Sequence, residues 1–194
     1  MTNPKGGGAM RASKRSILLA AVLLSLTLLA GCQGVSRKGN STGVPVTLAD
    51  GASTSEGAGV EIAGDTVTFT QGGTYRLSGT LTEGTLRVDT QDPVELILDG
   101  VAVKNSTGPA LDVDGEGDLL LTLAEGAENT LTTAAEDPVV EAKGSVTLTG
   151  EGSLTLASES GHGLQSKGDV TVTGGSLTVT AAGGKAAVTV RLPP

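Results

Sequence analysis

A short acidic stretch, "DVDGEGD", carries the densest group of side chains that could do chemistry. Its carboxylates belong to Asp112, Asp114, Glu116 and Asp118, and two glycines separate the last three of them. Ca²⁺ takes six to eight oxygen ligands, most of them carboxylates and carbonyls. The stretch lacks the full spacing of an EF-hand loop. Taken alone, it is more typical of a solvated acidic face that aids solubility than of a calcium site.

Further charges occupy equivalent positions of a repeated sequence. Two columns are expected on one outer face: Arg87, Asp112, Glu141 and Gln165, and then Asp89, Asp114, Lys143 and Lys167. Arg87 beside Asp112 predicts an exposed ion pair worth about 0.2–1 kcal/mol. Asp89 beside Asp114 is a like-charge pair, which a cation would relieve. Asp89 therefore joins the four other acids as a candidate calcium ligand.

The scarce residue types exclude several kinds of site. Cys32 is the only cysteine and His162 the only histidine, which excludes an internal disulfide and argues against a His-rich metal site or a Ser-His-Asp triad. Phe69 and Tyr75 are the only aromatic residues. Without an aromatic strip on which sugar rings could stack, recognition of crystalline cellulose or chitin is not expected.

The charge is unevenly distributed along the chain. The formal net charge is −8, yet the part from Ser41 onward holds 7 basic and 21 acidic residues, a balance of −14. Such a surface repels nucleic acid and anionic headgroups, and it attracts cations. Nucleic acid is therefore excluded as a partner.

The elements that must position these residues come from an internal repeat. The segment "EAKGSVTLTGEGSLTLA" at 141–157 returns as "QSKGDVTVTGGSLTVTA" at 165–181, offset by 24 residues. Each unit contains three short alternating segments bounded by Gly, Asp and Ser. The leading apolar residues of successive units are Leu86, Leu111, Val140 and Leu164. A repeat of this length, too short to bury its own apolar face, indicates a solenoid.

Three strands in about 24 residues predict an all-β fold, a parallel β-helix of triangular cross-section. Equivalent strands then stack as parallel neighbours about 4.8 Å apart. We expect Gly100, Gly150 and Gly174 to turn the corners. A β-sandwich of antiparallel hairpins is the alternative, but it does not predict the repeat. The open last coil also favours some self-association, because it exposes unpaired strand edges.

The N-terminal part is expected to be a signal peptide followed by a flexible linker. A basic region precedes an apolar run of 13 residues, Ile17–Leu29, too short for a membrane-spanning helix. The run ends in "LAGC", which resembles the bacterial lipobox and implies cleavage before Cys32 and lipidation of that residue. We therefore predict a signal peptide at 1–31, a flexible linker at 32–60 and the β-helix domain at 61–194. The protein would be extracytoplasmic and anchored to the cell surface or outer membrane.

Several segments together resemble a family of secreted bacterial carbohydrate-binding-domain-containing proteins. They are "GTYRLSGTL", "VELILDGVAVKNSTGPAL", "LTLAEGAENTLT", "KGSVTLTGEGSL" and "GLQSKGDVTVTGGSLTV". The resemblance implies a right-handed parallel β-helix that binds calcium and an acidic polysaccharide such as polygalacturonate. Where the family often carries two adjacent acids, this chain has Gly168-Asp169. Family members also usually continue with several further coils.

The resemblance implies noncatalytic, calcium-assisted binding of an acidic polysaccharide. The candidate metal ligands are Asp89, Asp112, Asp114, Glu116 and Asp118. A calcium ion shared with the sugar carboxylates would overcome the negative charge of the domain. The candidate sugar-binding residues are Arg87, Lys143, Lys167 and Asp169, since basic groups pair with sugar carboxylates.

Other functions compete with this hypothesis. A structural or adhesive envelope module would use its ladder faces to contact another protein or another copy of itself. A polysaccharide lyase would need a base such as Lys143 or Lys167, but no motif supports one. Threonines on the second wall resemble an ice-binding face, although Glu95, Ile97, Asp99 and Leu120 interrupt that ladder.

Overall fold

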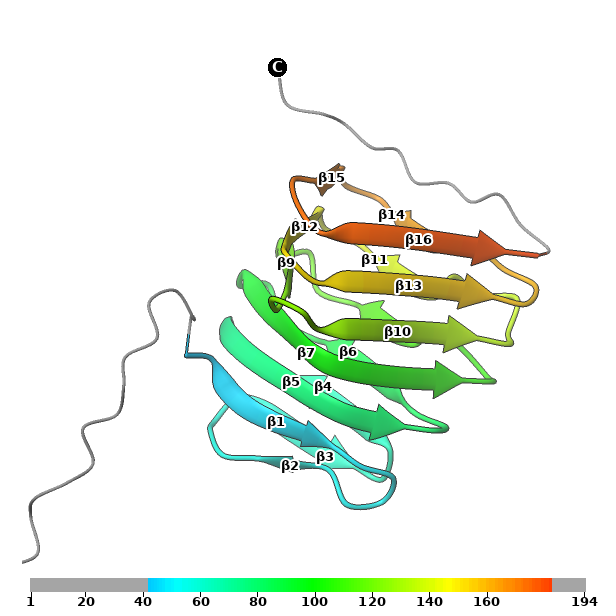
Figure 1. Cartoon of the computed structure of the whole chain (residues 1–194). Coiled ribbons are helices and arrows are strands. Elements are labelled where there is room, and N and C mark those ends of the chain that lie inside the picture. Colours follow the sequence, from blue (N-terminus) through cyan, green and yellow to red (C-terminus); the bar gives the residue numbers. More distant parts are fainter. Residues whose placement is uncertain (1–41, 183–194) are drawn as a thin grey trace, which may run out of the picture. The chain divides into compact units, whose positions relative to one another are not determined.

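The computed structural model describes residues 42–182, and within them every regular element is a β-strand. The chain winds into a β-solenoid of about four turns whose parallel strands stack coil upon coil (Figure 1). The strands form three walls, as the three segments of each repeat predict. The expectation of stacked parallel strands is therefore confirmed, and antiparallel hairpins are limited to the first part of the domain.

The first wall is a separate sheet of short strands. It contains β4 (Thr66–Phe69), β6 (Thr85–Val88), β8 (Leu111–Val113), β11 (Val140–Ala142) and β14 (Leu164–Ser166). Leu86, Leu111, Val140 and Leu164 lie opposite one another in register. Successive coils therefore measure 25, 29 and 24 residues along this column. The spacing of apolar residues in the sequence predicted this register correctly.

The second and third walls share one larger sheet. The second wall holds β9 (Leu119–Leu123), β12 (Val146–Gly150) and β15 (Val170–Val172), and the third holds β10 (Glu128–Thr133), β13 (Ser153–Ser158) and β16 (Ser176–Ala181). In the earlier coils β5 (Gly73–Leu81) and β7 (Val94–Asn105) run through both walls. The first half of β7 pairs with β9 and its second half with β10, so the two walls diverge after this coil.

The solenoid begins earlier than the predicted boundary at residue 61. Strand β1 (Val44–Leu48) pairs in parallel with β5, and β2 (Thr54–Ser55) pairs antiparallel with β1. Strand β3 (Val60–Ala63) pairs antiparallel with β4. Val46 and Leu48 are buried in the same core as the later coils. Residues 44–60, which the composition assigned to a linker, are therefore part of the folded domain.

Aliphatic side chains fill the interior in columns that run along the solenoid. On the second wall, Leu96, Leu121 and Leu148 lie in register and are almost fully buried. Burying one such side chain stabilises the fold by about 1.5–3 kcal/mol. In the last described coil Leu164 is buried, but five other residues of its strands are only half-buried: Ser166, Val170, Val172, Leu177 and Val179. Packing is therefore looser in the last described coil than in the coils before it.

Glycines turn the corner between the second and third walls. Gly100 and Gly150 have φ angles of +79° and +104°, a backbone conformation that other residues rarely adopt. In the last described coil the positive φ belongs to Gly175, at +76°, and not to the predicted Gly174. Because Gly174 and Gly175 are adjacent, the sequence alone could not show which of them adopts the positive φ angle.

The two aromatic residues lie together inside the early coils. The rings of Phe69 and Tyr75 are 4.8 Å apart between centroids, and both side chains are buried. The Tyr75 hydroxyl donates a hydrogen bond to the Gln71 carbonyl at 2.9 Å. Neither ring is available as a platform for sugar stacking, because both are buried.

Candidate functional site

The predicted charged columns lie on the outer face of the first wall. Arg87 lies opposite Asp112, and Asp112 lies opposite Glu141. The second column follows the ends of the strands. Backbone hydrogen bonds hold it in step: the amides of Asp114 and Lys143 donate to the carbonyls of the preceding coil, at Val88 and Val113. The charged residues of the two columns, which we call the charged ladder, are Arg87, Asp89, Asp112, Asp114, Glu141, Lys143 and Lys167.

Basic side chains neutralise the acids at the centre of the charged ladder. Arg87 lies 3.5 Å from a carboxylate oxygen of Asp112, which is the predicted ion pair. Arg87 also reaches diagonally to Asp114, and Lys143 binds the other carboxylate oxygen of Asp114. Asp114 therefore has two cationic partners. The sequence predicted repulsion between Asp89 and Asp114, to be relieved by a metal ion. In the structure the positive charges of Arg87 and Lys143 offset this repulsion.

The five candidate calcium ligands do not converge on one point. Among residues 42–182 no three His, Cys, Asp or Glu side chains are placed to hold a metal ion. Asp89 and Glu116 are exposed, and Asp118 lines a pocket on the second wall. Ca²⁺ requires six to eight oxygens around one centre. The acidic residues therefore do not fit a built calcium site.

Two neighbouring carboxylates of the charged ladder have pKa values shifted in opposite directions. The pKa of Asp114 is lowered, chiefly because Lys143 donates a hydrogen bond to it. The same bond raises the pKa of Lys143. The pKa of Asp112 is raised, because burial disfavours its charged form more than the charge of Arg87 favours it. Asp114 is thus an ion-pair partner, while Asp112 carries its charge at some cost to stability.

Neutralising these two acids should change stability with opposite signs at neutral pH. Asp112→Asn should raise the free energy of unfolding, because a raised pKa means that charging the folded protein is unfavourable. Asp114→Asn should lower it, since a lowered pKa gives stability that is present above the ordinary value of 3.8. Both changes should stay below about 1 kcal/mol at these half-exposed positions.

Urea denaturation at neutral pH and at about pH 2 would measure both effects. Both should fade as the pH falls, the first below the raised pKa of Asp112 and the second through the lowered pKa of Asp114. Equal signs at neutral pH would contradict the opposite roles.

The later coils leave basic side chains open to solvent. Lys143 and Lys167 follow equivalent strands of neighbouring coils, and both are exposed. No carboxylate of the described residues forms an ion pair with Lys167. The candidate Asp169 is exposed, and its backbone carbonyl accepts the Val146 amide at 2.8 Å. This end of the ladder can therefore present ammonium groups to an anionic ligand.

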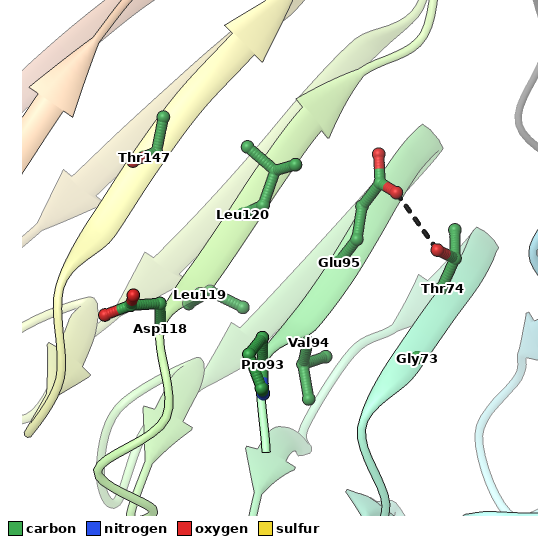
Figure 2. Close-up of a pocket in the computed structure, with 9 residues that line it drawn as sticks. All are labelled: Gly73, Thr74, Pro93, Val94, Glu95, Asp118, Leu119, Leu120 and Thr147. Carbon is green, nitrogen blue, oxygen red and sulfur yellow. Dashed lines mark hydrogen bonds between the residues drawn. The ribbon is translucent and has the colours of Figure 1, made fainter. Parts of the chain in front are cut away.

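A pocket that the sequence did not predict lies on the outer face of the second wall (Figure 2). Its volume is about 420 Å³, and strands β5, β7, β9 and β12 contribute to it. Glu95 faces this surface, where one carboxylate oxygen accepts a hydrogen bond from Thr74 Oγ1 at 3.0 Å. The other accepts one from Thr122 Oγ1 at 2.7 Å. We call this the second-wall pocket.

Apolar and acidic side chains share the second-wall pocket. Leu120 lies in register between Glu95 and Thr147. Pro93 and Asp118 also line the pocket; each directly precedes a strand, β7 and β9 respectively, as Figure 2 shows. The signal for this pocket was present in the sequence, where Glu95 and Leu120 break the threonine ladder. The sequence interpretation treated them only as interruptions of a candidate ice-binding face.

The folded part is therefore a parallel β-solenoid with a charged ladder on one wall and a small pocket on the next. The profile of the family described as "Carbohydrate-binding domain-containing protein" matches residues 63–191. The chain belongs to this family, whose description indicates a carbohydrate partner.

One solved structure has a similar fold. It is described as "the polysaccharide lyase-like protein from C. thermocellum", in a gadolinium derivative, and matches with a TM-score of 0.64 at 24% identity. The match covers 72% of this chain and 62% of that chain, so the present chain spans less than two thirds of that protein. At this identity the likeness supports the fold. No curated protein matches the chain in sequence.

Some predictions lie outside the described residues. They are the signal peptide at 1–31, the lipidated Cys32 and the first part of the linker. Within residues 42–182 no helix is long and apolar enough to cross a membrane.

Proposed function

We propose that this domain binds an acidic polysaccharide without catalysis, through the basic end of the charged ladder. The observation that carries the proposal is the placement of Lys143 and Lys167 in neighbouring coils, both exposed. Neighbouring strands lie about 4.8 Å apart, so the two lysines can approach the same stretch of a polymer. An ammonium group and a sugar carboxylate form a charge-assisted hydrogen bond, about twice as strong as a neutral one.

Arg87 and Asp114 help to orient this surface. The Asp114 carboxylate holds both Arg87 and Lys143, which limits the freedom of two long side chains. A basic side chain that is already ordered loses less entropy when a ligand binds. Arg87 is half-exposed and can add a contact to the polysaccharide. Asp169 can accept a hydrogen bond from a sugar hydroxyl at the edge of the site.

The protonation of Lys143 supports a noncatalytic role for this residue. A lyase requires an unprotonated base to remove a proton from the sugar. The hydrogen bond to Asp114 raises the pKa of Lys143, so this lysine stays protonated at neutral pH. It can bind an anion in this state, but it cannot accept a proton.

The proposed contacts are direct and do not pass through calcium, because the acidic residues do not form a cation site. The balance of −14 from Ser41 onward repels a polyanion at long range. Salt screens such repulsion over about 8–10 Å. Lipid anchoring through Cys32 and an extracytoplasmic location are also proposals, and they rest on the N-terminal sequence.

The double variant Lys143→Gln/Lys167→Gln should bind polygalacturonate about tenfold more weakly than the native protein, since hydrogen bonds to charged groups contribute about 1.5–3 kcal/mol when well formed and less when exposed. Each single variant, Lys143→Gln and Lys167→Gln, is compared with Lys104→Gln, which removes one charge at an exposed position on the third wall and should change nothing. Calorimetric titration with polygalacturonate measures all of these variants, with calcium and with a chelator.

Three outcomes would count against the proposal. Binding that appears only with calcium would favour a bridging ion. Equal affinity of the double variant and the native protein would remove the lysines from the site. No binding to polygalacturonate under either condition would favour the alternative of a structural or adhesive envelope module.

A further inference from the structure

We infer that the second-wall pocket is a separate sugar subsite for an uncharged pyranose unit, and that Glu95 determines its specificity. This inference rests on the proposed function, because it treats the occupant as part of the same polysaccharide. It assigns the pocket a selectivity opposite to that of the charged ladder.

The Glu95 carboxylate is held in a fixed orientation. Thr74 and Thr122, from the strands on either side of β7, donate hydrogen bonds of 3.0 and 2.7 Å to its two oxygens. A carboxylate can accept about four hydrogen bonds, so each oxygen keeps a free acceptor position. A fixed acceptor of this kind suits the hydroxyl groups of a sugar, which donate.

Aliphatic side chains supply a surface for the sugar ring. Leu120 is half-buried and lies beside Glu95 on the neighbouring strand, and Pro93 lines the pocket at the start of the strand that carries Glu95 (Figure 2). The C–H groups of a pyranose ring can pack on such side chains, since contact with apolar atoms removes apolar surface from water. A volume of about 420 Å³ is within the range of small-ligand sites.

The charge of the pocket excludes uronates. Glu95 and Asp118 are the only ionisable residues among the nine described residues that line it, and both are acids. A sugar carboxylate in this pocket would be repelled, and no lining residue could pair with it. A sugar that carries only hydroxyl groups avoids this repulsion and can donate to both acids.

The pocket lies within reach of the proposed binding surface. Lys143 follows the first-wall strand β11, and Thr147 lies in the next strand, β12, where it lines the pocket. Four residues of extended chain span at most about 14 Å. One polymer can therefore contact the lysines and the pocket around a single corner. The ligand class is a mixed polysaccharide that contains uronate and uncharged residues.

The methyl groups of Leu120 allow a direct test by NMR of the methyl-labelled protein. The probes are the methyl glycosides of glucose, galactose, mannose and rhamnose, together with methyl galacturonide. At least one neutral glycoside should shift the Leu120 resonances saturably, and the galacturonide should not. Glu95→Gln should weaken this binding about tenfold, because a charged acceptor is replaced by a neutral one. Glu128→Gln, at an exposed acid on the third wall, should leave it unchanged.

The inference would be overturned if no neutral glycoside shifts Leu120, if the galacturonide shifts it equally, or if Glu95→Gln and Glu128→Gln behave alike. Polygalacturonate binding separates this failure from failure of the proposed function. Glu95→Gln should retain it and the lysine double variant should not. If a neutral glycoside shifts the Leu120 resonances as expected but polygalacturonate does not bind, the charged ladder is not a polysaccharide site. The inference that one polymer contacts both surfaces then fails as well.

Discussion

Replacing Asn129 by alanine should lower the free energy of unfolding by about 3–5 kcal/mol, since each buried polar group left without a partner costs about 1–3 kcal/mol. The Asn129 side chain is 2% exposed and faces the core of the third wall. Its Oδ1 accepts the amides of Gly100 and Val101 at 3.1 and 2.9 Å, and its Nδ2 donates to the Ser153 carbonyl at 3.0 Å. One side chain thus connects three successive coils.

Asn105→Ala is the matched control for this substitution. Asn105 also makes three hydrogen bonds, to Thr107 and Pro109, but all of them lie within its own turn. Asn105→Ala should therefore lower the free energy of unfolding by no more than about 1–2 kcal/mol. Guanidinium denaturation followed by circular dichroism would measure both variants. Similar losses for the two would show that Asn129 does not act as a connection between coils.

Asn129 also shows where the sequence was insufficient for the fold. The repeat predicts the apolar columns correctly, because alternation and coil length together determine the register. In the third wall, however, the coil with Leu131 has asparagine where the next coil has Leu154. From the sequence alone, a polar residue in an apolar column is expected to destabilise the core. Only the structure shows that backbone groups of the neighbouring coils surround it and satisfy its hydrogen bonds.

The start of the domain was missed for a different reason. Strand β1 is five residues long and lies among Gly, Ser, Thr and Asp residues, so its local composition is that of a linker. Its partner β5 pairs Val44 with Tyr75, which lies 31 residues further along the chain. Pairing at this distance leaves no periodic signal, because β1 precedes the first full repeat.

The candidate site was predictable in its adjacencies but not in its contacts. The repeat places Arg87 beside Asp112 and Asp114 beside Lys143, and the structure agrees. It could not show that Arg87 also reaches Asp114 diagonally, which removes much of the reason for a metal ion. The second-wall pocket depends on four strands that meet only in the folded protein.

The matched pair Leu154→Ala and Leu177→Ala should separate the stability of an inner coil from that of the last described coil. The two leucines are neighbours in one column of the third wall. Leu154 is 1% exposed, whereas Leu177 is half-buried. Leu154→Ala should cost about 2–5 kcal/mol, because it removes transfer free energy and leaves a cavity. Leu177→Ala should cost less than about 1.5 kcal/mol, in proportion to its smaller burial.

Urea denaturation of both variants, with the slope of the transition recorded, tests this difference. In a solenoid each coil contacts only its neighbours, so a cavity between two inner coils weakens both interfaces. Equal losses would contradict a gradient of packing along the stack. The gradient matters for function, because Glu95, Leu120 and Asp114 lie on the well-packed middle coils. Rigid inner coils hold Glu95, Asp114 and Lys143 in fixed positions, which lowers the entropy lost when a polysaccharide binds, whereas Lys167 follows a strand of the more loosely packed last described coil.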